Sequence, residues 1–201
     1  ADAEQAFLKA IELDPKYAAP HNGLGWLYAE HLGRHTDAEK AFLQDIQLDP
    51  KSGSGQRGLA WLCLLHSGDI QLAQKYANEA IEIEPTHRAT TFIAIALTTW
   101  TTGWASAQSQ VPEWLQKFDG GNISVYRNPL IAFGRKIHEL GGLSTLAEML
   151  HAVEDRPHWK PWSEAVSALA AGTGPGGFSS DEASQIYDVI SKPNPKDGQS
   201  G

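Results

Sequence analysis

The spacing of apolar side chains predicts a helix in the first stretch of the chain. Between residues 3 and 13, the pair Ala6 and Phe7 is followed four positions later by the pair Ala10 and Ile11, so these side chains share one face of a helix. Pro15 ends this helix, because proline disfavours helical geometry in the residue before it. Similar apolar spacing, with glycine or proline at the ends, predicts further helices at residues 19–32, 54–66, 70–83, 90–101, 112–118, 128–140, 144–154, 162–171 and 181–191. No stretch predicts a strand.

One pattern recurs along the first half of the chain. The stretch at residues 38–50, AEKAFLQDIQLDP, matches AEQAFLKAIELDP at residues 3–15 and AQKYANEAIEIEP at residues 73–85, so each copy begins 35 residues after the one before it. A fixed period of this size indicates a solenoid of stacked units.

The rest of each unit keeps the same step and resembles a known family. The glycines Gly33, Gly68 and Gly103 fall one period apart, between the two expected helices of each unit. The pattern resembles the tetratricopeptide repeat (TPR) family, whose unit is two antiparallel helices, at Leu24, Gly25, Tyr28, Ala38, Phe42 and Pro50. Each unit carries one extra residue near the glycine turn, and His21 stands where the family has its first tryptophan. The resemblance implies an all-α, helical-hairpin solenoid over residues 1–104.

The period fails after Gly103, because Pro112 falls in the middle of the expected second helix. We therefore expect residues 105–191 to form a C-terminal helical subdomain that caps the open end of the solenoid, since each repeat leaves an apolar face for the next. Residues 192–201 have the composition of a disordered tail. Because the chain begins inside the second helix of a unit, we also expect it to be a piece of a longer protein.

Charge and cysteine content narrow the classes of function. The 201 residues include 16 Lys and Arg against 24 Asp and Glu, a net charge of -8, so neither a nucleic acid nor an anionic membrane is the expected main partner. No apolar run approaches the roughly 20 residues of a membrane span. The single cysteine, Cys63, takes the position of Tyr28 one unit earlier and is expected in the core. A lone cysteine favours a reducing compartment, and we expect the cytoplasm.

The resemblance implies that the first helix of each unit lines a concave groove. Residues four positions apart share one face of such a helix. The residues expected to face the groove are Asn22, Trp26 and Glu30 in one unit, Arg57 and Trp61 in the next, and Phe92 and Trp100 in the third. Aromatic and arginine side chains contribute most of the binding energy at many interfaces. We therefore expect Trp26 and Trp61 to stand side by side as the main contacts for a protein or peptide.

Some TPR proteins hold the C-terminal carboxylates of chaperones with a cluster of Lys, Asn and Arg. Only Asn22 and Arg57 suit that role here, because Trp26, Trp61 and Phe92 occupy the other positions. The groove thus favours an apolar helix or an extended peptide with one acidic contact to Arg57. In the alternative, the chain itself occupies the groove, and the tryptophans contact each other or the C-terminal helices.

Catalytic and metal-binding patterns are weak. Glu148 and His151 lie three positions apart on an expected helix, but no matching pair completes a metal site, and His158 adds no known spacing. The glycines of residues 172–177 lack the lysine of a phosphate-binding loop. We expect no enzyme activity, no cofactor and no metal. The enzymatic alternative is a site around Glu148, His151 and His158.

The predicted function is recognition of a partner protein or peptide by a scaffold whose oligomeric state is unknown. The alternative is an architectural or sensor role. The segment at residues 158–165, HWKPWSEA, loosely resembles the tail that follows TPR arrays in large bacterial sensor proteins, in which an effector domain and an NTPase domain precede the repeats. In that case the repeats would hold an upstream domain, and the groove would be self-occupied.

Overall fold

The structure is a computed structural model that describes residues 2–117 and 127–192. All regular structure within these ranges is helical, which confirms the predicted all-α fold. The chain divides into two compact units, Ala1–Leu97 and Thr98–Gly201. The predicted boundary near residue 104 and the predicted capping of the repeats stay predictions. The expected tail, apart from its first residue, lies outside the described residues.

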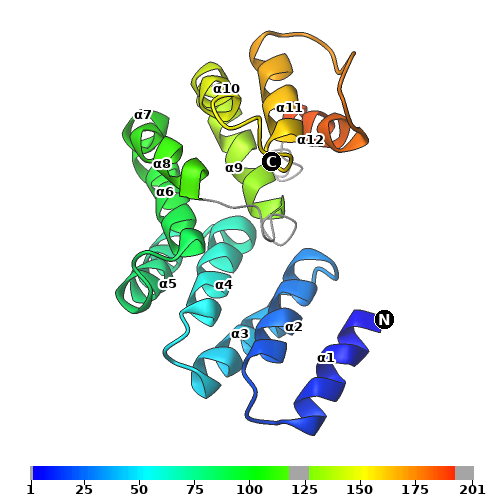
Figure 1. Cartoon of the computed structure of the whole chain (residues 1–201). Coiled ribbons are helices and arrows are strands. Elements are labelled where there is room, and N and C mark those ends of the chain that lie inside the picture. The colour runs from blue at the N-terminus through cyan, green and yellow to red at the C-terminus, as the bar shows by residue number, and fades with distance from the viewer. Residues whose placement is uncertain (1, 118–126, 193–201) are drawn as a thin grey trace, which may run out of the picture. The chain divides into compact units, whose positions relative to one another are not determined.

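The N-terminal unit is a row of antiparallel helices joined by short turns (Figure 1). These helices are α1 (Asp2–Leu13), α2 (Ala19–Glu30), α3 (His35–Leu48), α4 (Ser54–Leu62), α5 (Ile70–Ile83) and α6 (Arg88–Thr102), the last of which continues into the second unit. Helix α2 packs against α1 and α3, and α4 packs against α3 and α5. Hairpins therefore stack in sequence order, as in a solenoid.

Phe42, on α3, lies at the centre of this unit's core. Its side chain is fully buried, and its ring lies between Gly25 of α2 and Gly58 of α4. A Cβ atom at Gly25 would come within 2.4 Å of the ring, and one at Gly58 within 2.3 Å. Only glycine leaves room for the ring at either position. These two glycines therefore let α2 and α4 approach α3 closely.

The same contact occurs one repeat earlier. A Cβ atom at Gly23 would lie 2.5 Å from the ring of Phe7 on α1. One repeat later the sizes are exchanged, because the corresponding positions hold Ala77 and Ile93, both fully buried. Successive interfaces thus combine one large and one small side chain, and either helix can carry the large one.

The extra residue of each unit is accommodated where its first helix ends. After α4, Cys63–Ser67 forms a π-helix. At the equivalent point after α2, the amide of Leu32 donates to the carbonyl of Leu27, 3.2 Å away and five positions earlier. A π turn absorbs one inserted residue, and such turns are frequent at functional sites. The inserted residue is therefore accommodated by a wider turn at the ends of α2 and α4.

The C-terminal unit contains less regularly spaced helices. They are α7 (Trp104–Ala107), α8 (Val111–Lys117), α9 (Arg127–Glu139), α10 (Leu143–His151), α11 (Lys160–Ala170) and α12 (Asp181–Ser191). The sequence predicts α8 to α12 to within three residues at each end. It does not predict α7 or the 3-10 helix Gln108–Gln110 that follows it.

Aromatic side chains build the core of this second unit. The rings of Trp114 and Trp159 lie 5.7 Å apart in a T-shaped contact, and those of Trp104 and Phe133 lie 6.2 Å apart. Trp159 is 1% exposed. The cavity beside these rings measures only about 20 Å³, room for about one water molecule. The segment around Trp159 therefore serves packing within this unit.

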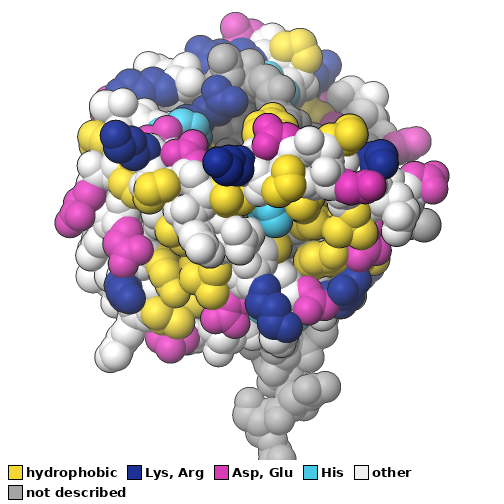
Figure 2. Space-filling view, turned by 90° about the horizontal axis from the view of Figure 1, so that it is seen from below, with side chains coloured by type: hydrophobic (Ala, Val, Ile, Leu, Met, Phe, Trp, Pro, Cys, Tyr) yellow, Lys and Arg dark blue, Asp and Glu magenta, His cyan; other side chains and the backbone are white. Residues whose placement is uncertain are grey.

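Charges of both signs are interspersed on the face shown in Figure 2, so the net charge of -8 is not gathered there. Some large apolar side chains, such as Leu13 and Tyr17, are exposed, which is ordinary for a protein surface. Within the described ranges, the helices lack the combination of length and apolar character that crossing a membrane would need.

Candidate functional site

The predicted recognition face begins on α2, with Trp26. The indole is half-buried, and its ring meets Phe42 edge-on with centroids 5.5 Å apart and an interplanar angle of 77°. Trp26 is thus held on the core of the repeat while part of its side chain stays accessible. An aromatic side chain held in this way is the type of residue that anchors many interfaces.

Trp61 does not join Trp26 on an exposed face. Trp61 is 1% exposed, and its ring lies 5.1 Å from that of Phe92, which is also 1% exposed. The expectation that Trp61 and Phe92 are exposed contact residues is therefore wrong about their exposure. The physical reason is that these rings, on α4 and α6, are stabilised by removing each other's apolar surface from water. The contact of Trp61 with Phe92 lies within the repeats, so it differs from the self-contacts that the alternative names, between tryptophans or with the C-terminal helices.

The charge of Arg57 is used inside the unit. Its guanidinium pairs with the carboxylate of Glu84 and donates to Oγ1 of the buried Thr90 at 3.3 Å. Only 11% of the Arg57 side chain is exposed. An acidic ligand at Arg57 would therefore compete with Glu84. The sequence holds a signal for this pair, because an acidic residue precedes the closing proline of each unit, at Asp14, Asp49 and Glu84.

The other predicted contacts, Asn22, Glu30 and Trp100, are half-buried. Glu30 Oε1 lies 3.8 Å from Nε2 of His66 on the next hairpin, and 10% of the Glu30 side chain is exposed. Trp100 lies beyond the division of α6, in the second unit.

Helices α2 and α4 also carry buried polar atoms that have no hydrogen-bond partner among the described residues. These atoms are Asn22 Nδ2, Gln56 Oε1 and Trp61 Nε1. An unpaired buried polar group costs about 1–3 kcal/mol of stability. The two helices therefore hold hydrogen-bonding capacity that the described part of the chain does not use.

Asp45 is a buried acidic residue that the sequence pattern does not single out. It is 1% exposed on α3 and accepts a hydrogen bond from Ser54 Oγ at 2.6 Å, where α4 begins. Burial raises the pKa of Asp45, and the hydrogen bonds from Ser54 and from the backbone of Gly55 oppose that rise. Asp45 thus caps α4 from a neighbouring helix, which is a structural role. Its signal in the sequence is that the corresponding positions hold Ala10 and Ala80.

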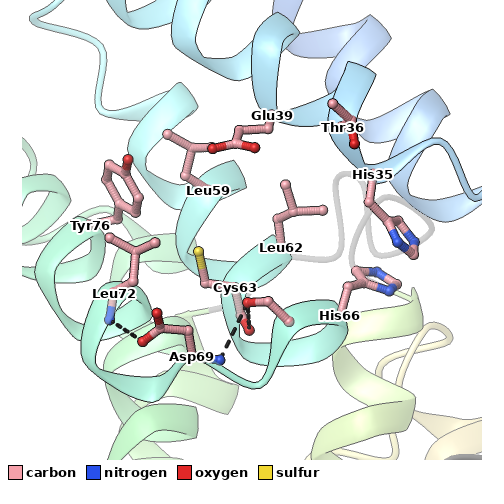
Figure 3. Close-up of a pocket in the computed structure, with 11 residues that line it drawn as sticks. His35, Thr36, Glu39, Leu59, Leu62, Cys63, His66, Asp69, Leu72 and Tyr76 are labelled. Carbon is pink, nitrogen blue, oxygen red and sulfur yellow. Dashed lines mark hydrogen bonds between the residues drawn. The ribbon is translucent and has the colours of Figure 1, made fainter.

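A cavity of about 360 Å³ opens at the turn end of the hairpins, between α3, the end of α4 and α5 (Figure 3). In this view Glu39 lies on one side of the cavity, with Cys63 and Asp69 on the opposite side, and Tyr76 lies at one end. At the other end, the rings of His35 and His66 stack with their centroids 4.0 Å apart. The polar lining therefore combines two carboxylates, two imidazoles, a phenol, a thiol and the hydroxyls of Thr36 and Ser67.

The thiol in this cavity is not set up as a nucleophile. Burial raises the pKa of Cys63, and the negative charges of Asp69 and Glu39 add to the rise, while a hydrogen bond involving Ser67 opposes it. A thiol with a raised pKa stays protonated at neutral pH and is a poor nucleophile. Cys63 is 7% exposed, which confirms the core position expected from the sequence.

The C-terminal candidates Glu148, His151 and His158 do not form a recognisable site. His151 Nδ1 lies 2.8 Å from Glu154 Oε2, and 73% of the His151 side chain is exposed. The ring of His158 lies 5.4 Å from that of Trp159. Across the part of the chain that the structure describes, no three His, Cys, Asp or Glu side chains are placed to hold a metal ion together. The enzymatic alternative gains no support from this arrangement.

Comparison with models of protein families gives two matches. Residues 6–40 and residues 59–87 each match a model described as tetratricopeptide repeat. The first match covers most of α1, all of α2 and the start of α3, and the second covers the end of α4 and all of α5. These hairpins are tetratricopeptide repeats. A search of curated proteins finds no matching sequence.

TPR hairpins generally mediate interactions between proteins, and proteins built from them are generally non-catalytic scaffolds. The accessible part of Trp26 and the cavity beside Glu39 both belong to this TPR unit. Both are accessible features of the described part of this unit.

Proposed function

We propose that the TPR unit binds a segment of a partner polypeptide, with Trp26 as the central contact. The position of Trp26 carries this proposal, because its indole is fixed on Phe42 and yet partly accessible. Asn22 lies one turn earlier on the same helix and is half-buried. A partly accessible aromatic ring held on a helix suits the apolar side chains of a bound peptide.

The remaining predicted contacts take indirect roles in this proposal. Trp61 and Phe92 contribute to the packed core of the unit, because both are fully buried. Arg57 is held by Glu84, so a carboxylate of the partner reaches it only by exchange with Glu84. The unit acts by binding alone, with no chemistry of its own.

The test uses peptides selected on the full chain from a displayed random library. Their affinities are then measured by fluorescence anisotropy. Trp26→Ala should weaken binding by about tenfold or more, as expected for a central aromatic contact. The matched control is Tyr17→Ala, which removes an aromatic ring that is 54% exposed and lies in the turn before α2. That variant should bind as the parent does, and circular dichroism should show parental helicity for both variants.

Equal affinities for the parent, Trp26→Ala and Tyr17→Ala would contradict the role of Trp26, as would equal losses in the two variants. Trp61→Ala is unsuitable for this test. Removing a fully buried tryptophan side chain costs about 3–5 kcal/mol of stability, so any loss of binding would be confounded with unfolding.

A second candidate function is architectural, and one specific observation favours it. Trp61 contacts Phe92 and Arg57 pairs with Glu84, so several side chains of the predicted groove are already satisfied within the unit. In that case the library selection should yield no peptide whose binding depends on Trp26. The same experiment thus separates the two candidates.

A further inference from the structure

Two interfaces between repeats of the TPR unit hold different residues at equivalent positions. The first interface lies between α1 and the α2–α3 hairpin, and the second lies between α3 and the α4–α5 hairpin. At the first interface, Glu4 of α1 accepts hydrogen bonds from Tyr28 Oη and from Arg34 Nη1, each at 2.9 Å. The guanidinium of Arg34 lies over the ring of Tyr28, 4.2 Å from its centroid. The chain therefore fills this position with its own arginine, which is held by a carboxylate and an aromatic ring.

At the second interface, one period later, the corresponding residues are Glu39, Cys63 and Asp69. The carboxylate is kept, the aromatic ring is replaced by a much smaller thiol, and the arginine is replaced by a second carboxylate. The cavity of about 360 Å³ lies at this position. The space at the second interface thus corresponds to the place of the phenol and the guanidinium at the first.

The two carboxylates at the second interface have no cationic partner in the chain as described. Within residues 2–117 and 127–192, Glu39 and Asp69 form no ion pair. One oxygen of Asp69 accepts a hydrogen bond from the amide of Leu72 at 2.9 Å, which caps α5. The negative charge of Glu39 contributes to the raised pKa values of both Cys63 and Tyr76, so its field reaches across the cavity.

The remaining lining suits the stem and the head of a long cationic side chain. Leu59, Leu62 and Leu72 provide apolar contacts for an aliphatic stem. Tyr76 offers an aromatic ring at the end of the cavity near Glu39 (Figure 3). A planar guanidinium is the cation that combines stacking on a ring with paired hydrogen bonds to a carboxylate.

We propose that this cavity takes the side chain of an arginine from a bound partner polypeptide. Glu39 and Asp69 bind the guanidinium, Tyr76 stacks on it, and the leucines contact the stem. The partner's arginine thus takes the place that Arg34 fills at the first interface. This inference rests on the proposed function, because the occupant belongs to a bound polypeptide.

The test measures binding of a small arginine probe to the full chain. The probe is the peptide acetyl-Gly-Ser-Arg-Ser-Gly-amide, followed by two-dimensional NMR of the isotope-labelled protein. Its control contains citrulline, which has nearly the shape of arginine but no charge. The arginine probe should shift the resonances of Cys63, His66 and Leu72, with a Kd on the order of 1 mM. The citrulline probe should bind roughly tenfold more weakly.

Glu39→Gln should weaken binding of the arginine probe by roughly tenfold, because it removes the carboxylate that corresponds to Glu4. The matched control is Glu82→Gln, which makes the same change of charge at an exposed position of α5 outside the cavity lining. Glu82→Gln should leave the affinity unchanged. This control excludes general attraction of a cation to a protein with a net charge of -8.

A second variant gives the second interface the residues that occupy the equivalent positions of the first. Cys63→Tyr combined with Asp69→Arg supplies the missing ring and guanidinium beside Glu39, so the arginine probe should no longer shift the cavity resonances. The spectrum should keep the dispersion of a folded protein, and the melting temperature should fall by no more than the loss of the Asp69 cap on α5 accounts for. Continued binding by this folded variant would overturn the proposal.

Equal shifts by the arginine and citrulline probes, or parental affinity of Glu39→Gln, would also overturn it. The proposed function has a separate readout in the loss of affinity on Trp26→Ala. If the arginine probe fails while peptide binding still depends on Trp26, the cavity assignment is wrong and recognition by the TPR unit stands. If both fail, the proposed function fails with it.

Discussion

The cavity described in the TPR unit and the one described in the C-terminal unit differ in size and in lining. The TPR unit contains a cavity of about 360 Å³ whose lining includes carboxylates, imidazoles and a thiol. The C-terminal unit packs Trp114, Trp159 and Trp162 around a cavity of only about 20 Å³ with an entirely apolar lining. The larger of these two cavities, with polar side chains in its lining, is thus in the repeats, while the aromatic rings of the C-terminal unit pack closely around theirs.

This difference follows from how each unit is constructed. In the repeats, the same positions meet at every interface, so replacing the ring of Tyr28 by the thiol of Cys63 leaves a space that the neighbouring positions do not refill. In the C-terminal unit, no period restricts where large side chains stand, and aromatic rings fill the core. A repeated scaffold can thus change one interface without altering its fold.

The largest effect is expected where close packing is most complete. Trp159→Ala should lower the free energy of unfolding by about 3–5 kcal/mol, because the lost ring is 1% exposed and leaves a cavity. Urea unfolding should show this loss, and hydrogen exchange should accelerate in α8 and α11. Ser167→Ala, an exposed position on α11, serves as the control and should change stability by less than about 0.5 kcal/mol. A similar small change for Trp159→Ala would contradict the contrast between the units.

A smaller effect is expected from adding one methyl group in each unit. At Gly58 the new Cβ atom would lie 2.3 Å from the ring of Phe42. The ring cannot move away, because Gly25 packs against its other side. Gly58→Ala should therefore lower stability by about 1–2 kcal/mol, the strain exceeding the gain of about 1 kcal/mol from better helix propensity. At Gly134 the new atom would meet Cδ1 of Ile190 at 2.8 Å, the mobile end of a flexible side chain. Gly134→Ala should change stability by less than about 1 kcal/mol.

A double-mutant cycle tests the stated cause of the Gly58 effect. Phe42→Leu should make the added cost of Gly58→Ala fall below about 1 kcal/mol, because the clashing ring is gone. If Gly58→Ala costs the same with and without the ring, the strain has another origin. If Gly58→Ala and Gly134→Ala cost the same, the glycine positions of the two units do not differ as proposed.

The same elements show how much of the fold could be predicted from the sequence. The 35-residue period predicts α1 and α5 to within one residue, because each helix repeats the same stripe between fixed turn residues. It does not predict the burial of Trp61, since periodicity identifies the face of a helix and not the ring, here Phe92, that covers it. Helix α7, WASA, is too short to show an apolar period.

The candidate site was only partly visible in the sequence. The substitution of Cys63 for Tyr28 was visible, but its consequence depends on a three-dimensional contact, the bond from Tyr28 to Glu4. Without that contact, the sequence shows only that Glu39 follows Glu4, and Asp69 follows Arg34, by one period of 35 residues. The tyrosine-to-cysteine change would have pointed to the cavity only once the filled interface was known.

The smallest expected effect is a loss of stability at acidic pH, and it concerns the TPR unit alone. His87 stands directly before α6, and its Nδ1 accepts a hydrogen bond from the amide of Ala89 at 3.2 Å. This bond requires the neutral ring. Burial lowers the pKa of His87 below its ordinary value of 6.5, and the nearby charge of Arg57 lowers it further.

The sign of the pH effect follows from this lowered pKa. Below pH 6.5 the unfolded chain binds a proton at His87 while the folded chain does not, so stability falls as the pH decreases from 6.5 toward the folded pKa. His87→Asn keeps a side-chain acceptor for Ala89 and removes the titration. Urea unfolding at pH 7 and pH 5.5 should show a smaller loss of stability on acidification in His87→Asn than in the parent. Since carboxylates titrate alike in both proteins, an equal loss would mean that the hydrogen bond to Ala89 does not depend on a neutral His87 in the folded unit.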